Sequence, residues 1–186
     1  ATGKSTVSRL LRTLGAPVFD ADLAAREALL PGTPAWQALA AVEAGKYITA
    51  SGEVDRPALA ARVFADAAFR EWLNALTHGE IRAAAERFLA EQRSKCAPVV
   101  VLDVPLLFEA HWDVLVDEIW VVFVDEATQC RRLMARDHIG ETAARAKMRS
   151  QWSLSEKAKR AQVVLDNSAD EESLKKAVYQ AWQALQ

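Results

Sequence analysis

The amino-acid sequence predicts an α/β fold with a parallel β-sheet, and three observations support this prediction. Gly3–Thr6 reads G-K-S-T directly before a helical pattern, which is the second half of the phosphate-loop motif G-x-x-x-x-G-K-[ST]. Apolar runs rich in β-branched residues recur at Pro98–Leu107, Glu118–Val124 and Gln162–Leu165, and such runs are typical of buried parallel strands. Helical patterns fill the gaps between the runs, as a P-loop NTPase core requires.

The first element is a phosphate loop that leads into a helix. Apolar residues recur at the helical spacing i, i+3, i+4 and i+7: Val7, Leu10, Leu11 and Leu14. Gly15 then suits the end of the helix. Backbone N–H groups of such a loop cradle phosphate, Lys4 reaches the β- and γ-phosphates, and the Ser5 hydroxyl binds Mg²⁺. The first glycine of the motif would precede Ala1. We therefore expect the first strand and half of the loop to lie upstream of Ala1.

A short strand at Val18-Phe19 is followed by an alanine-rich, nearly all-helical segment over residues 21–93. Asp55-Arg56-Pro57 and Asp66 are typical helix starts, because an aspartate can cap the first turn and proline fits there. Gly45 to Gly52 is predicted to be a loop or short hairpin. His78 is predicted to lie at a junction between two helices, in a structural role.

The C-terminal part alternates strands with helices, which are predicted at residues 126–136, 142–151 and 171–185. Nine arginines and lysines lie between Arg131 and Arg160, and most of them are expected to form a solvated helical face. A phosphate-transfer site nevertheless needs cations, and a mobile arginine-rich lid is one way to supply them. Arg136 precedes the turn 137–140, a candidate hinge, and is the strongest lid candidate.

Four carboxylates follow strands, where ligands bind in open α/β sheets. Asp20 and Asp22 come directly after the Val18-Phe19 strand, and either could bind Mg²⁺ or take a proton from a substrate hydroxyl. The alternative is that one of them only caps the next helix. Asp103 ends an apolar strand, where a Walker-B acid would hold Mg²⁺ through water, although the turn itself could need its side chain. Asp125 is expected to cap the helix that follows it.

Composition limits the function classes. The chain has 186 residues, of which 51 % are hydrophobic and 26 % are charged, as in an ordinary globular domain. Its formal net charge of −2 gives no basic field for nucleic acid, and no apolar run approaches the roughly 20 residues that span a bilayer. Its two cysteines are too few for a disulfide framework. We expect a cytoplasmic monomer without nucleic-acid or membrane partners.

In six segments, which together span essentially the whole chain, the sequence resembles the dephospho-CoA kinase family, P-loop kinases of the nucleoside monophosphate kinase-like group. The segments Asp20–Ala35 (D-A-D-L-A-A-R-E-A-L-L-P-G-T-P-A) and Val99–Glu109 (V-V-V-L-D-V-P-L-L-F-E) are specific to that family among P-loop kinases. The four shorter segments are Gly52–Asp66, Leu73–His78, Arg132–Asp137 and Val163–Ser168.

The resemblance implies ATP-dependent phosphorylation of the ribose 3′-hydroxyl of dephospho-CoA, the last step of coenzyme A biosynthesis. It implies one domain over residues 1–186. The core would comprise residues 1–20, 94–130 and 161–186, with a helical substrate-binding insertion at 21–93 and a lid at 131–160.

Site residues carry over by position. Gly3, Lys4, Ser5 and Thr6 would bind the ATP phosphates and Mg²⁺. Asp20 would face the 3′-hydroxyl as base or orienting group, Arg136 would contact the transferred phosphoryl group, and Asn167 would lie near the adenine of ATP.

The sequence departs from the family pattern at Gly79, where the family usually has proline; we expect a looser helix junction there. Two alternative functions stay open at this point. One is another small-molecule P-loop kinase, which would share the G-K-S-T and the lid but not the Asp20–Ala35 segment. The other is a catalytically inactive chain that lacks half of its phosphate loop and acts as a binding partner.

Overall fold

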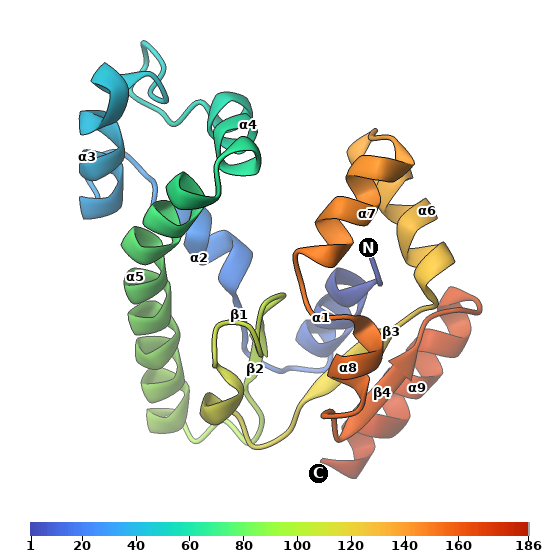
Figure 1. The fold of residues 1–186 in the computed structure, drawn as a ribbon. Helices are drawn as coiled ribbons and strands as arrows, with labels where there is room; N and C mark the ends of the chain where they lie inside the picture. Colours follow the sequence, from blue (N-terminus) through green and yellow to red (C-terminus); the bar gives the residue numbers. More distant parts are fainter. Residues whose placement is uncertain (186) are drawn as a thin grey trace. The chain divides into compact units, whose positions relative to one another are not determined.

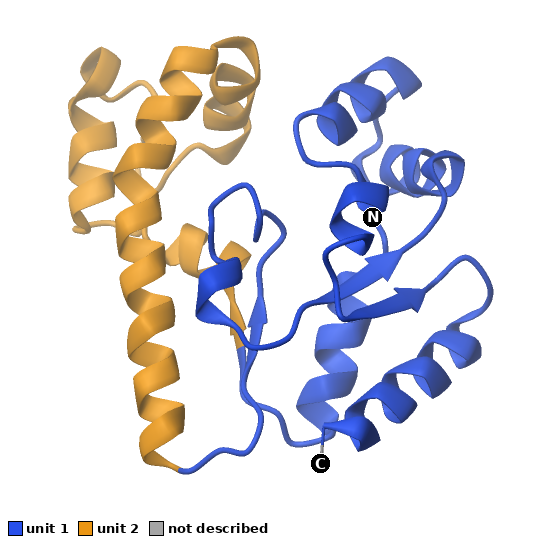
Figure 2. Cartoon of the chain, turned by 60° about the horizontal axis from the view of Figure 1, so that its bottom comes forward, with its two compact units in different colours: residues 1–18, 96–186 blue, residues 19–95 orange. Residues whose placement is uncertain are grey.

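The computed structural model describes residues 1–185, which form two compact units (Figure 2). The core unit contains Ala1–Val18 and the chain from Cys96 onward, and the helical unit is Phe19–Lys95. Parallel strands alternate with helices in the core unit, which confirms the α/β class (Figure 1). None of the helices within residues 1–185 has both the length and the apolar character needed to cross a membrane.

In the core unit, strands β3 and β4 pair in parallel, from Trp120 opposite Val163 to Phe123 opposite Asp166. Their carboxyl ends therefore meet at one edge. The strands are β1 Val18–Asp20 (whose last two residues belong to the helical unit), β2 Val101–Asp103, β3 Trp120–Phe123 and β4 Val163–Asp166. The helices are α1 Lys4–Thr13, α6 Glu126–Asp137, α7 Glu141–Arg149, α8 Leu154–Ala158 and α9 Glu171–Ala184, with a 3-10 turn η2 at Asp113–Leu115.

Helices α1 and α9 contact each other and bury their apolar faces with the strands. The predicted stripe of α1 supplies Val7 and Leu11, each 5 % exposed. Each fully buried aliphatic side chain contributes roughly 1.5–3 kcal/mol to folding. The rest of this cluster is Ala16, Val122, Leu165, Leu174, Val178 and Trp182.

Helix α1 ends as the sequence predicts. Gly15 adopts a left-handed φ of +92°, which costs glycine nothing because it lacks a Cβ. The Ala16 N–H donates to the Leu11 carbonyl and the Gly15 N–H to the Arg12 carbonyl, both at 3.0 Å. This is a Schellman ending, and it turns the chain towards β1.

The helical unit contains the predicted helix starts. Asp55 accepts a hydrogen bond from the Ala58 N–H and Asp66 accepts one from the Phe69 N–H, each at 3.0 Å. A single antiparallel bridge joins Ile48 and Val54 around the expected hairpin. The elements are α2 Ala21–Glu27, α3 Pro34–Ala41, η1 Val42–Gly45, α4 Arg56–Ala65 and α5 Ala67–Ser94.

The predicted helix junction at His78 is wrong, because α5 runs unbroken through it for 28 residues. A buried face continues at four-residue intervals through Phe69, Leu73, Thr77, Ile81 and Ala85. A glycine inside a helix costs only about 1 kcal/mol relative to alanine, and burial of this face outweighs that cost. Gly79 is therefore an ordinary helical residue here, and it loosens no junction.

The strand predicted at Pro98–Leu107 is also shorter than expected. Only Val101–Asp103 is extended, and the following residues turn back on themselves: the Trp112 N–H donates to the Leu107 carbonyl at 2.8 Å. The loop that follows the strand is itself buried in part: Phe108 and Trp112, just beyond the run, are each 5 % exposed. An apolar run alone does not separate a buried strand from a buried turn.

Candidate functional site

The phosphate-loop residues form the start of α1. Gly3 caps the helix with a φ of +100°, and its carbonyl accepts hydrogen bonds from the N–H groups of Thr6 and Val7 at 3.0 and 3.2 Å. A Cβ at Gly3 would collide with the side-chain amide of Asn167, so only glycine fits. Ser5 is exposed on the first turn, where N–H groups have no intrahelical acceptor. This helix end therefore suits an anion.

Lys4 and Asp103 form an ion pair between α1 and the end of β2. Asp103 is 6 % exposed, and its second carboxylate oxygen accepts a hydrogen bond from the Ser8 hydroxyl at 2.6 Å. A buried carboxylate is costly unless it is paired and hydrogen-bonded, and these two contacts meet that need. The structure thus brings two predicted site residues together.

Ser8 is a contact that the sequence prediction missed. It lies four residues after Lys4, so both side chains are on one face of α1, and Ser8 is 4 % exposed. The sequence did offer one indication of this contact: a hydroxyl four residues after the phosphate-loop lysine lies on the same face of the helix. Ser8 also lies between Val7 and Leu11 in the apolar stripe, and a small polar residue at such a position is easily interpreted as a packing residue without a functional contact.

Asn167 lies directly after β4 and joins the strand edge to the residues before α1. Its backbone N–H donates to the Phe123 carbonyl at 2.8 Å, and its side-chain amide donates to the Thr2 carbonyl at 2.7 Å. Together with its contact to Gly3, this arrangement lets Asn167 hold the loop backbone in place. The neighbouring Asp125 caps α6 as predicted, through the Thr128 N–H at 2.8 Å.

Arg136 lies near the C-terminal end of α6 and contacts its neighbour Asp137. Its guanidinium donates two hydrogen bonds to the Asp137 carboxylate, from Nε at 2.7 Å and from a terminal nitrogen at 3.3 Å. Lys147 of α7 donates to the same carboxylate at 2.8 Å. The hydrogen bonds from Arg136 and Lys147 hold the pKa of Asp137 well below its usual range. One carboxylate thus binds two cations on the α6–α7 hairpin.

Asp20 and Asp22 belong to the helical unit. Asp20 ends β1 and caps α2, where its carboxylate accepts a hydrogen bond from the Leu23 N–H at 3.0 Å. Asp22 is exposed on the first turn of the same helix. Asp20 therefore has the capping role that the sequence left open, and this contact uses one carboxylate oxygen.

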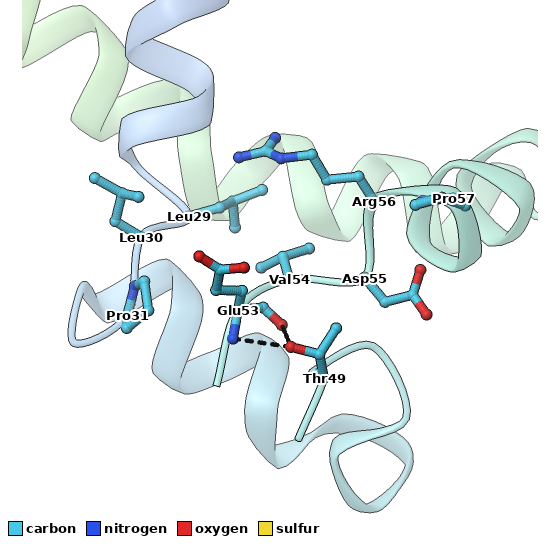
Figure 3. A pocket seen from close by; sticks show the side chains of 9 residues that line it. All are labelled: Leu29, Leu30, Pro31, Thr49, Glu53, Val54, Asp55, Arg56 and Pro57. Carbon is cyan, nitrogen blue, oxygen red and sulfur yellow. Dashed lines mark hydrogen bonds between the residues drawn. The ribbon is translucent and has the colours of Figure 1, made fainter. Parts of the chain in front are cut away.

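A pocket of about 460 Å³ lies within the helical unit (Figure 3). Its walls combine aliphatic and polar side chains, and its charged groups are two carboxylates, Glu53 and Asp55, and the guanidinium of Arg56. Acidic groups outnumber basic ones, so the lining favours a neutral ligand segment over a diphosphate. The remaining lining residues are Leu29, Leu30, Pro31, Thr49, Val54 and Pro57.

Comparison with known proteins gives a consistent result. The family model of dephospho-CoA kinase matches residues 1–173. Dephospho-CoA kinase from Geobacter sulfurreducens is 46 % identical over 182 residues, covering 98 % of this chain and 92 % of the relative. The enzyme of the same name from Symbiobacterium thermophilum is 43 % identical over 184 residues, covering 99 % of this chain and 77 % of the relative.

Solved structures have the same fold. A crystal structure of a Thermus thermophilus protein superposes with a TM-score of 0.79 at 35 % identity, covering 100 % of this chain and 93 % of that one. Dephospho-CoA kinase from Campylobacter jejuni superposes with a TM-score of 0.75 at 23 % identity, covering 100 % and 92 %. At this lower identity the second match supports the fold alone.

Proposed function

The chain belongs to the dephospho-CoA kinase family, and we propose how its residues carry out the family's reaction. In that reaction the γ-phosphoryl group of ATP is transferred to the ribose 3′-hydroxyl of dephospho-CoA, which yields coenzyme A and ADP. The transition state of phosphoryl transfer is loose, so the protein contributes mainly positioning and positive charge. The observation that carries the assignment of roles is the contact of Lys4 with the buried Asp103 at the start of α1.

Lys4 is proposed to bind the β- and γ-phosphates of ATP. Its ammonium has three donors, so it can keep Asp103 as a partner while it reaches a phosphate oxygen. Gly3 allows the backbone to approach the phosphates closely. Asn167 holds this backbone in place through its hydrogen bond to the Thr2 carbonyl. This contact with Thr2 supports a role for Asn167 at the phosphate loop in addition to the adenine contact that the family resemblance implies.

Mg²⁺ is proposed to accompany ATP. The described residues include no cluster of three acidic, histidine or cysteine side chains that could hold a metal alone. Mg²⁺ normally takes one or two protein oxygens together with waters and substrate phosphates, so such a cluster is not required. The exposed Ser5 hydroxyl would bind the ion directly and Asp103 through water, and the ion would neutralise charge on the phosphates.

Asp20 is proposed to orient the 3′-hydroxyl of the acceptor. It lies at the carboxyl end of β1, where ligands bind in α/β folds, and its cap of α2 fixes the carboxylate at that point. Accepting a hydrogen bond from the hydroxyl would align it for attack and assist its deprotonation. The carboxylate of Asp22 is assigned a supporting role at the same helix end.

The segment 21–93 is proposed to be the acceptor-binding insertion, with residues 131–160 as the lid and the remainder as the core of one domain. The pocket in the helical unit supports this, because its mixed aliphatic and polar, weakly acidic lining suits the uncharged pantetheine arm of dephospho-CoA, which carries both methylene and amide groups. Val54→Trp should fill the pocket and raise the KM for dephospho-CoA without lowering kcat. The exposed Val114→Trp is the matched control. An unchanged KM would show that the pocket takes no part.

A cytoplasmic location and a monomeric state are proposed on general grounds. The net charge of −2 and the ordinary composition fit a freely diffusing enzyme of small-molecule metabolism.

The experiment that tests the phosphate site is the substitution of Lys4 in the full-length protein. Lys4→Ala should lower kcat on the order of 10²–10³-fold, as expected for loss of a cation that stabilises the transition state. Lys4→Gln keeps a hydrogen-bond donor for Asp103 but removes the charge, so it should fail similarly while folding normally. Lys175→Met, which removes a surface ion pair with Glu172 on α9, should be fully active. Turnover close to wild type in both Lys4 variants would remove Lys4 from the site.

A further inference from the structure

A largely buried ion pair joins the loop after β2 to α8; the side chains of Lys157 and Glu109 are 10 % and 18 % exposed. The Lys157 ammonium lies 2.8 Å from a carboxylate oxygen of Glu109. The same ammonium donates to the Pro105 carbonyl at 2.9 Å. The Trp152 N–H donates to the same Glu109 oxygen at 2.8 Å. One carboxylate oxygen thus joins the segment that follows Asp103 to the segment that follows α7.

Aromatic stacking reinforces this junction. The rings of Phe108 and Trp152 are parallel to within 3°, with centroids 5.6 Å apart. The guanidinium of Arg160 lies over the Trp152 ring at 4.2 Å and 6.0 Å from the centroid of Phe108. The Trp152 ring is therefore held by groups from both segments, and its backbone is held by Glu109.

Stability alone is a weak reason for such a pair. Desolvation of two charges often costs more than their attraction returns, and well-packed apolar residues can replace buried pairs without loss. The second oxygen of Glu109 is buried and has no hydrogen-bond partner among the described residues, which adds to the cost. The pair instead fixes the geometry of the backbone, because it binds the Trp152 N–H and the Pro105 carbonyl at the same point.

The elements around the junction separate into two groups. Helix α8 contacts strand β3 of the core. Helices α6 and α7 contact each other and share a small apolar cluster of Cys130, Leu133 and Ala144. Trp152 lies between the two groups, three residues after α7 ends and two before α8 begins.

We propose that Glu109 and Lys157 are a positioning pair that makes Trp152 the fixed root of the α6–α7 hairpin. The hairpin then moves about the residues between Arg149 and Trp152, and α8 stays with the core. Because Trp152 is fixed, the hairpin closes in the same position each time. The pair thereby determines where Arg136 lies in the closed state. This inference rests on the proposed function, because it takes the hairpin as the lid that carries Arg136 to the phosphoryl group.

The test separates positioning from stability. Glu109→Leu/Lys157→Met removes both charges and keeps apolar volume, so its Tm should stay close to that of the wild type. Its kcat should nevertheless fall about tenfold, because small displacements of a catalytic group are costly. The Kd for ATP, measured by calorimetry, should not change. Amide hydrogens of residues 150–153 should exchange faster than in the wild type.

Each alternative has its own result. Wild-type kcat in a double variant with wild-type Tm overturns the proposal, and so does a tenfold loss of ATP affinity. Lys175→Met, which removes an exposed ion pair on α9, should change none of these quantities. If the double variant does not fold, Glu109→Gln, which keeps the size and an acceptor, should lower kcat about threefold; unchanged kcat would overturn the proposal.

Failure of the proposed function would be visible separately. A wild-type protein that does not phosphorylate dephospho-CoA would contradict that function. The hydrogen-exchange comparison needs no turnover, and unchanged exchange at residues 150–153 in the double variant would reject the positioning pair on its own.

Discussion

At the scale of the residue, the charge of Asp103 decides how the phosphate site is built. The carboxylate is buried, and its two oxygens are taken by Lys4 and Ser8. Its charge holds the ammonium of Lys4 at the start of α1. In the proposed role of Lys4, this pre-organisation would reduce the entropy lost when ATP binds. The sequence pattern proposed roles for Lys4 and Asp103 as separate motif positions, but it did not predict their contact, because the two residues are 99 positions apart in the chain.

Asp20 carries the first residue-scale prediction. Asn and Asp cap helices about equally well, so Asp20→Asn should keep α2 intact while removing the charge. We expect kcat to fall by roughly 10²–10⁴-fold, the usual worth of general-base assistance, with the KM for dephospho-CoA changed much less. Steady-state kinetics in the full-length protein measure both constants.

The matched control is Asp22→Asn, which should be milder because Asp22 is exposed on the first turn of α2. If Asp22→Asn were inactive and Asp20→Asn nearly normal, Asp22 would be the residue at the acceptor hydroxyl and Asp20 the supporting one. Sequence reasoning could not order these carboxylates, since both follow the same short strand and only the structure shows which one caps the helix.

At the scale of the element, the α6–α7 hairpin is braced as a unit across the turn that separates its two helices. Arg136 and Lys147 come from different helices and share the carboxylate of Asp137, which braces the hairpin internally. His138 follows with a φ of +53°, and Gly140 starts α7. The predicted turn at residues 137–140 is therefore confirmed as the break between two helices.

Arg136→Ala tests the lid at this scale. Because Arg136 pairs with its neighbour Asp137 here, we expect it to contact phosphate only when the hairpin closes. The substitution should lower kcat on the order of 10²–10³-fold, since it removes a transition-state cation, and should leave the Kd for ATP nearly unchanged. Calorimetry and steady-state kinetics separate the two effects.

The control for loss of a guanidinium is Arg82→Ala on α5, which breaks an exposed pair with Glu86 and should be silent. A large loss of ATP affinity with normal kcat in Arg136→Ala would assign Arg136 to ground-state binding instead.

Most helix boundaries were predictable from capping residues, because a cap is a local interaction. Asp55, Asp66 and Asp125 each bond the N–H three residues ahead. Helix α8 was missed, although Ser153 and Glu156 have the S-x-x-E spacing of a capping box and the Glu156 N–H donates to the Ser153 hydroxyl at 3.2 Å. The unbroken α5 and the short β2 were not predictable locally, because packing against distant residues decided both.

At the scale of the whole molecule, the sequence resemblance and the structure support one account. The resemblance in six segments predicted the family, and a family-model match over residues 1–173 confirmed it. Two contacts could not be predicted from any sequence motif: the Glu109–Lys157 ion pair and the stacking of Trp152 on Phe108. They join positions 43 or more residues apart in the chain, and one sequence gives no measure of such distances.

The central claim is that this protein phosphorylates the ribose 3′-hydroxyl of dephospho-CoA with ATP. The most direct measurement is ³¹P–¹H correlation NMR of the product formed by the full-length protein with ATP, Mg²⁺ and dephospho-CoA. The account predicts one new phosphate coupled to the 3′ proton of the ribose, with ADP formed in equal amount. A phosphate at any other position, or consumption of ATP without a phosphorylated acceptor, would contradict it.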